Sequence, residues 1–156
     1  MSNQPEIHIR PATAADEAVL RGLAERLTAF ELPAWRKAGD IVTADAREML
    51  DAVRAAAPDN EVFLAERAGV PVGCLHVLDL TDFSGTRHAH ISVLATTEEA
   101  EGSGVGRALL AHAETWARRR AHSLLTLNVF AANERARRFY DRAGLSAEML
   151  KYAKPL

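Results

Sequence analysis

The chain has 156 residues, of which 48% are hydrophobic and 26% are charged, and its formal net charge is −2 at pH 7. This length predicts one domain over residues 1–156, with a core that needs neither disulfides nor a structural metal. Acidic and basic residues are interleaved, which argues against a nucleic-acid partner, because a surface for phosphate backbones carries a basic excess. No stretch approaches the roughly 20 apolar residues of a membrane span and no secretion signal opens the chain, which predicts a cytoplasmic protein with no membrane partner.

One short strand and two helices are predicted before residue 60. The strand is stopped by Pro11, and Thr13 has the pattern of an N-cap for the helix that follows. Four apolar residues then recur at helical spacing: Val19, Leu20, Leu23 and Leu27. After a break over residues 30–40, Thr43 begins a second helix that ends before Pro58.

From residue 61 the apolar period changes to two, which predicts strands. Residues 61–67 and 74–80 form a hairpin, and Cys74, the only cysteine, is expected there as a small buried thiol. Residues 82–86 turn the chain into a further strand over residues 87–96. In that strand Ala89, Ile91, Val93 and Ala95 share the core face, and His88, His90, Ser92 and Leu94 share a face toward a cleft.

The last third of the chain alternates helices and strands. One helix has its apolar stripe at Val105, Leu109, Ala113 and Trp116, with a solvated basic end at residues 118–120. A strand over 124–130, a helix over 133–144 closed by Gly144, and an irregular strand over 145–156 follow. The predicted order β-α-α-β-β-β-α-β-α-β gives an α/β fold, a mixed sheet with helices on both faces.

The stretch EGSGVG at residues 101–106 places glycines directly before a helix. The first turn of a helix has N–H groups without internal partners, and glycines let a phosphate approach them closely. The spacing differs from a dinucleotide fingerprint and lacks the Gly-Lys-Ser/Thr ending of a triphosphate loop. The pattern therefore indicates either a main-chain anion site or merely a tight turn.

Two motifs resemble those of the GNAT family of N-acetyltransferases. The first, Q/R-x-x-G-x-G/A after a bulged strand, is matched at Gly104 and Gly106, with Gly102 as a common extra glycine. The second, N-x-x-A-x-x-(F/L)-Y-x-x-x-G-(F/L), is matched at Asn133, Ala136, Phe139, Tyr140, Gly144 and Leu145. The resemblance covers the chain from Ile91 onward and implies a GNAT fold, mostly antiparallel, with a cofactor cleft between two splayed strands.

The resemblance also implies acetyl-CoA as the cofactor. Backbone amides of residues 103–107 would hold its pyrophosphate, the backbone of 94–96 would pair with the pantetheine arm, and Asn133 would orient that arm or a water. The cofactor-binding residues implied are Leu94, Ala95, Thr96, Glu101, Gly102, Ser103, Gly104, Val105, Gly106, Arg107, Asn133, Ala136 and Tyr140. Tyr140 would donate a proton to the departing thiolate, whereas its purely structural role would be packing on the sheet.

Glu101 departs from the family pattern, which has Gln or Arg at this place. A carboxylate facing the phosphates would weaken CoA binding by repulsion. We expect Glu101 to turn outward or to pair with Arg107 or another base.

The general base is the least determined part of the predicted site. Ser92 stands where many relatives have a strand carboxylate, so the catalytic candidates are Ser92 itself, His90 on the same face, and Glu98 or Glu99 through water. Both strand histidines also fit ordinary solvated or hydrogen-bonded positions. His88-x-His90 lacks a further ligand, so no metal is expected.

The segment between the first two helices tends to bind the acceptor in this fold. Glu31 and Asp40 would attract a cationic amine and Trp35 would stack on it, although an exposed loop with a core-anchoring Trp explains the same residues. The predicted function is direct acetyl transfer to a primary amine of a small molecule or peptide. Alternatives are a protein N-terminus or lysine as acceptor, and a degenerate acyl-CoA-binding module. A homodimer through the C-terminal strands, as in many relatives, is a further expectation.

Overall fold

The computed structural model describes residues 4–156; residues 1–3 of the predicted domain lie outside the described residues. A five-stranded sheet has the order β1-β2-β3-β4-β5, in which the first three pairings are antiparallel and β4 pairs with β5 in parallel. The predicted fold class, a mixed and mostly antiparallel sheet with helices on both faces, is confirmed. The strands are β1 Ile7–Pro11, β2 Asn60–Arg67, β3 Val70–Thr81, β4 Arg87–Thr96 and β5 Leu125–Leu127. The helices are α1 Glu17–Ala24, α2 Ala38–Ala55, α3 Val105–Arg119 and α4 Glu134–Arg142, with 3-10 turns η1 Ala14–Asp16 and η2 Glu25–Thr28.

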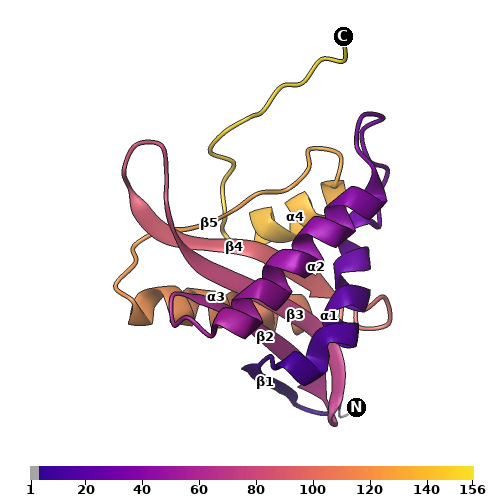
Figure 1. Ribbon diagram of the computed structural model, residues 1–156, viewed down its shortest axis with the longest axis vertical. Helices are drawn as coiled ribbons and strands as arrows, with labels where there is room; N and C mark the ends of the chain where they lie inside the picture. The colour runs from indigo at the N-terminus through magenta and orange to yellow at the C-terminus, as the bar shows by residue number, and fades with distance from the viewer. Residues whose placement is uncertain (1–3) are drawn as a thin grey trace.

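The sheet lies between two pairs of helices, α1 and α2 in front and α3 and α4 behind (Figure 1). Alternation along β2 supplies both cores, because Val62 and Leu64 pack under α1 and α2 while Phe63 and Ala65 pack under α3. The predicted apolar stripe of α3 is buried from Val105 to Trp116, which confirms its helical spacing. Cys74 is fully buried, also as predicted.

A β-bulge at Ser92 divides β4 into two halves. Val77 pairs with Ile91 and His76 pairs with Val93, so Ser92 is an extra residue without an opposite partner on β3. The extra residue reverses the alternation: Ile91 packs in the core under α3, whereas Val93 packs in the core under α1 and α2. The prediction that Ala89, Ile91, Val93 and Ala95 share one face is therefore wrong, although all four are buried.

The splayed cleft of the predicted fold is confirmed and begins at the same place. The parallel pairing of β4 with β5 runs from Ala89–Leu125 to Ile91–Leu127 and then stops. Within residues 4–156, residues 93–96 pair with a strand on their β3 side alone. The main chain of this half of β4 leads directly to the glycine stretch and α3.

Two predicted boundaries are wrong. The second helix begins at Ala38 rather than Thr43, because the N–H groups of Asp40 and Ile41 already bond to the carbonyl of Lys37 and Gly39 meets no crowding. The strand predicted over 124–130 is reduced to β5 by the splay.

The strand predicted over residues 145–156 does not form. Within the described chain, no backbone hydrogen bond involves residues 146–156, and this segment runs away from the sheet (Figure 1). Met149, Leu150 and Tyr152 are 70–88% exposed, and their spacing does not alternate as a half-buried strand requires. None of the helices described between residues 4 and 156 combines the length and apolarity needed to cross a bilayer.

Candidate functional site

The glycine stretch forms an open loop at the N-terminus of α3. Gly102 and Gly104 have φ values of 71° and 89°, which side-chain-bearing residues rarely adopt, and no atom lies within 4 Å of a Cβ built on either. The first helical hydrogen bond runs from Ala108 to the carbonyl of Gly104 at 3.0 Å. Within residues 4–156, the N–H groups of residues 104–107 have no backbone partner, whereas that of Ser103 already donates to Ala100 at 3.2 Å. Four of the five predicted amides are therefore free to bind an anion.

Glu101 pairs with two arginines. One carboxylate oxygen contacts Arg26 of η2 and the other contacts Arg135 of α4, so the predicted partner Arg107 is not used. Hydrogen bonding from Arg135 is the main reason that the pKa of Glu101 is lowered. Arg67 holds the same loop from β2, donating to the Ser103 hydroxyl at 2.8 Å and to its carbonyl.

Leu94, Ala95 and Thr96, which are predicted to pair with the pantetheine arm, lie on the half of β4 that β5 does not reach. Leu94 packs toward α3, and Ala95 packs in the core under α1 and α2. The Thr96 carbonyl accepts a hydrogen bond from Nε of Arg26 at 3.2 Å. The remaining main-chain groups along this edge have no strand beside them within residues 4–156.

Helix α4 brings the second motif next to the loop. Asn133 caps the helix, because its side-chain oxygen accepts the Ala136 N–H at 3.2 Å. Phe139 lies 3.4 Å from a Cβ built on Gly106, so the glycine permits close approach of α3 and α4. Burial raises the pKa of Tyr140 to about 12, which keeps its hydroxyl protonated at neutral pH.

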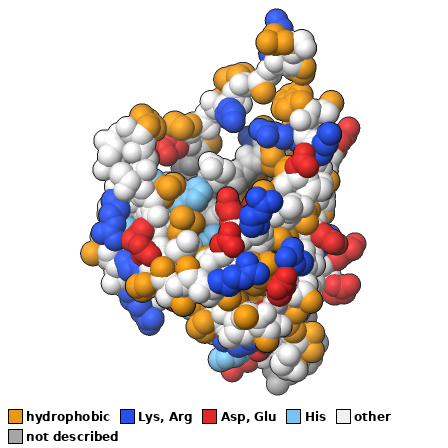
Figure 2. Space-filling model, in the orientation of Figure 1, with side chains coloured by type: hydrophobic (Ala, Val, Ile, Leu, Met, Phe, Trp, Pro, Cys, Tyr) orange, Lys and Arg blue, Asp and Glu red, His pale blue; other side chains and the backbone are white. Residues whose placement is uncertain are grey.

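Histidine and acidic side chains adjoin one another in the middle of the face that α2 crosses (Figure 2). The hydroxyl of Ser92 at the bulge donates to Glu48 of α2 at 3.4 Å. Nδ1 of His90 lies 2.8 Å from the Thr126 hydroxyl, and burial followed by the charge of His88 lowers the pKa of His90. Burial and the nearby Glu48 carboxylate raise the pKa of Asp45 to about 6. Glu48 of α2 thus brings a carboxylate to β4, whose own residues include none.

Only two of the three residues predicted to bind the amine acceptor lie in one pocket. Trp35 and Asp40 line one pocket of about 240 Å³ with Lys37, and Glu31 is not among its lining residues. Trp35 is 51% exposed, which excludes the alternative that it anchors the core. Phe30 of the same connection packs against Phe130, with ring centroids 5.6 Å apart, so this connection reaches the segment between β5 and α4.

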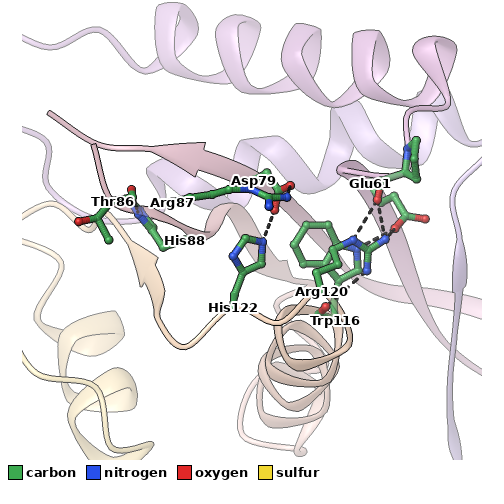
Figure 3. Close-up of polar contacts among 9 residues, drawn as sticks. Glu61, Asp79, Thr86, Arg87, His88, Trp116, Arg120 and His122 are labelled. Atoms are coloured by element: carbon green, nitrogen blue, oxygen red, sulfur yellow. Dashed lines mark hydrogen bonds and ion pairs between the residues drawn. The ribbon is translucent and has the colours of Figure 1, made fainter. Parts of the chain in front are cut away.

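A second polar cluster lies at the other end of β4 (Figure 3). Asp79 contacts Arg87 and His122, and the His122 ring points toward it from the segment after α3. The guanidinium of Arg120 lies 3.8 Å from the centre of the Trp116 ring and pairs with Glu61 at 2.7 Å. Arg120 is therefore not part of a solvated basic helix end, as its sequence context predicted. Among the described residues, 4–156, no group of three or more His, Cys, Asp or Glu has a metal-binding arrangement.

A family model described as Acetyltransferase (GNAT) family matches residues 21–145. The chain belongs to this family. The family match therefore agrees with the two motifs found in the sequence. The first motif lies in the open loop that follows β4, and the second covers α4.

Three known proteins illustrate what the chain is similar to. It is 43% identical over 97 residues to a 5-NmdU N-acetyltransferase of Pseudomonas phage PaMx11, covering 56% of this chain and 67% of that protein. It is 35% identical over 89 residues to a mycothiol acetyltransferase of Propionibacterium freudenreichii, covering 57% of this chain but only 28% of that protein. The structure of aminoglycoside N-acetyltransferase AAC(6')-Iy in complex with CoA has the same fold, with a TM-score of 0.72 and 17% identity over 100% of this chain and 99% of that one.

Sequence reasoning did not find Arg26, Arg67 and Glu48. Each lies on an element that precedes the GNAT motifs by at least 34 residues, and each reaches the site only through the fold. The one signal in the sequence was Glu101, because a carboxylate at this place of the signature predicts a basic partner elsewhere in the chain.

Proposed function

We propose that residues 1–156 form a single cytoplasmic GNAT domain that transfers acetyl directly from acetyl-CoA to a primary amine of a small molecule or peptide. The observation that carries this proposal is the release of β4 from β5 after Ile91, which leaves an unpaired strand edge leading into an open glycine loop. An extended amide-containing arm adds to such an edge as a strand would, and a diphosphate fits four free N–H groups.

The residues of this cleft fit coenzyme A. No side chain covers Gly102 or Gly104, and the N–H groups of residues 104–107 would hold the diphosphate. When bound, acetyl-CoA supplies the thioester from which the acetyl group is taken. The aminoglycoside N-acetyltransferase structure that shares this fold contains CoA, and the curated phage relative is named as an N-acetyltransferase, which supports the same donor and acceptor chemistry.

Side chains of this chain would donate a proton to the leaving sulfur and remove protons from the amine. Tyr140, protonated at neutral pH, would donate to the sulfur as the carbon–sulfur bond breaks, and the proton leaving the amine nitrogen would restore its hydroxyl. Before attack, an ammonium acceptor must lose a proton. His90 is one candidate for taking this proton, because its lowered pKa keeps the ring neutral at pH 7. A second route would run through Ser92, which would pass a proton to Glu48 across their hydrogen bond.

Binding and turnover are tested on the full chain. We expect isothermal titration to show CoA binding, and we expect a thiol-release assay with acetyl-CoA to show turnover with at least one member of a panel of amines, aminosugars, nucleoside amines and short peptides. Failure to bind CoA would overturn the assignment of the cleft.

The loop itself is tested with a matched pair of glycine variants. Gly104→Val should abolish measurable CoA binding, because its side chain would enter the space of the diphosphate. Gly85→Val is the control: its φ of 81° imposes similar backbone strain in a turn remote from the loop, and its Cβ also meets open space. Equal CoA affinity of the two variants would contradict the loop assignment.

A degenerate acyl-CoA-binding module is the second candidate, and the absence of a carboxylate from the described strand β4 favours it. This module would bind CoA in the titration and release no thiol with any amine. Turnover that depends on Glu48 would exclude it, because the carboxylate would then be supplied by α2 instead of β4.

A further inference from the structure

The cofactor loop is held by three arginines from three different elements. Arg67 of β2 binds Ser103, and Arg26 of η2 and Arg135 of α4 bind opposite oxygens of Glu101. The acidic residue thus connects two helical elements at the mouth of the loop, where the family pattern has Gln or Arg.

The arrangement leaves cationic N–H groups unused. Arg26 donates through Nε to Thr96 and through Nη2 to Glu101, and no hydrogen bond within residues 4–156 uses its Nη1. Arg135 contacts Glu101 through Nη1 and is 63% exposed. A guanidinium has five donors in a planar fork that suits phosphate oxygens, so each arginine can hold the carboxylate and an anion together.

The charges of the three groups do not cancel. One carboxylate and two guanidinium groups sum to one positive charge around Glu101, which precedes the free amides of residues 104–107 in the same loop. Without the carboxylate, two like-charged arginines from separate elements would repel each other and would lose their common partner. The long side chain of Arg135 would then regain its rotamer freedom in solvent.

We propose that Glu101 is a positioning residue that fixes Arg26 and Arg135 at the loop, so that their guanidinium groups bind the phosphates of CoA. This inference rests on the proposed CoA binding and names the residues that replace the missing basic group of the signature. Its rival is simple repulsion, in which Glu101 weakens CoA binding.

The two accounts predict opposite signs for Glu101→Gln, which restores a residue of the family pattern. If Glu101 positions the arginines, the variant binds CoA about tenfold more weakly, because a charge-assisted contact is replaced by a weaker neutral one. If Glu101 repels the phosphates, the variant binds more tightly. Glu25→Gln is the matched control, since Glu25 is exposed on η2 next to Arg26 and its carboxylate has no ion pair within residues 4–156, and the CoA affinity of this variant should stay within about twofold of the wild type.

A double-mutant cycle of Glu101 and Arg135 distinguishes a role of Glu101 in positioning the arginine from a general role in stabilising the fold. Arg135→Gln should weaken CoA binding about tenfold in the wild-type background and less than about twofold in the Glu101→Gln background, because the arginine is already released there. Both single variants should also flatten the dependence of CoA affinity on NaCl concentration, a change that loss of packing alone does not produce.

The outcomes decide between the proposals. No CoA binding by the wild type would overturn the proposed function itself. Wild-type binding with unchanged or tighter binding by Glu101→Gln, additive effects in the cycle, or an unchanged salt dependence would overturn the role of Glu101 and leave the proposed function standing.

Discussion

The two halves of β4 differ in the strands that pair with them and in the carboxylates that neighbouring elements bring to them. Residues 87–91 pair with β3, and residues 89–91 pair with β5 on the other side as well, whereas residues 93–96 pair with a strand on the β3 side alone within the described chain. Beside the first half, desolvation would raise the pKa of Asp79, but hydrogen bonds from Arg87 and His122 outweigh it and lower the pKa. On α2, whose Glu48 contacts Ser92 where the second half begins, burial and Glu48 raise the pKa of Asp45.

This contrast shows how one strand serves both stability and chemistry. The closed half satisfies its polar groups internally, with the Asp79 side chain only 13% exposed and the His122 side chain 3% exposed. The open half keeps main-chain groups without a strand beside them on the β5 side, which is the condition for binding an extended ligand there. The bulge at Ser92 is the boundary between them.

The largest expected effect comes from removing the hydroxyl of Tyr140, the proposed proton donor. Tyr140→Phe should lower kcat about 10²-fold or more in the thiol-release assay and leave the Kd for CoA unchanged, because the hydroxyl acts only as the sulfur departs. Tyr152→Phe is the control, since that hydroxyl is lost from a side chain that is 88% exposed in the C-terminal segment. An unchanged kcat for Tyr140→Phe would remove its proposed role.

Asp79→Asn removes the carboxylate that contacts Arg87 and His122 beside the closed half. We expect a loss of about 2 kcal/mol in the free energy of unfolding, because the His122 ring is buried and would lose a charged partner. The CoA affinity should not change. Glu114→Gln, which breaks only an exposed pair with Arg118, should cost less than about 0.5 kcal/mol. Urea denaturation measures both variants, and similar small losses would show that the cluster does not stabilise the fold.

The parts of the molecule that local pattern determines were predictable from sequence. The apolar stripe of α3, the β2–β3 hairpin and the glycine loop are each specified by residues within one element or one turn. The positive φ of Gly104 at the mouth of a helix follows from the spacing of the glycines before an apolar run. The GNAT motifs lie in the same local segments, and the family match agrees with them.

The bulge and the arginines were not predictable in this way. An extra residue in a strand is defined by the register of its neighbour, and Ser92 has no feature that marks it, so alternation placed Val93 on the wrong face. Arg26 lies 75 residues before Glu101, and the contact requires η2 to be packed against the end of β4. The C-terminal strand failed because pairing needs an edge, and β5 has only three residues.

A smaller effect is expected at the carboxylate that contacts the bulge. Glu48→Gln should lower kcat/KM for the best amine of the panel about tenfold, most strongly on the acidic side of the pH profile, because Ser92 would lose its proton acceptor. Asp51→Asn, one turn farther along α2 and paired only with Arg54 within the described chain, is the matched control. A proportional fall at every pH would indicate amine attraction without proton transfer.

The smallest effect should appear at Asp45, and its sign is opposite to that at Asp79. The pKa of Asp45 is about 6 in the folded chain and 3.8 as the reference value, so folding favours its protonated form. Wild-type stability should therefore decline as the pH rises from about 4 through 6, whereas Asp45→Asn does not titrate. Relative to its value at pH 4, the stability of Asp45→Asn should gain about 1 kcal/mol over the wild type by pH 8. Urea midpoints of both proteins at several pH values measure this difference. A stability difference that stays constant between pH 4 and pH 8 would show that ionising Asp45 does not destabilise the folded chain.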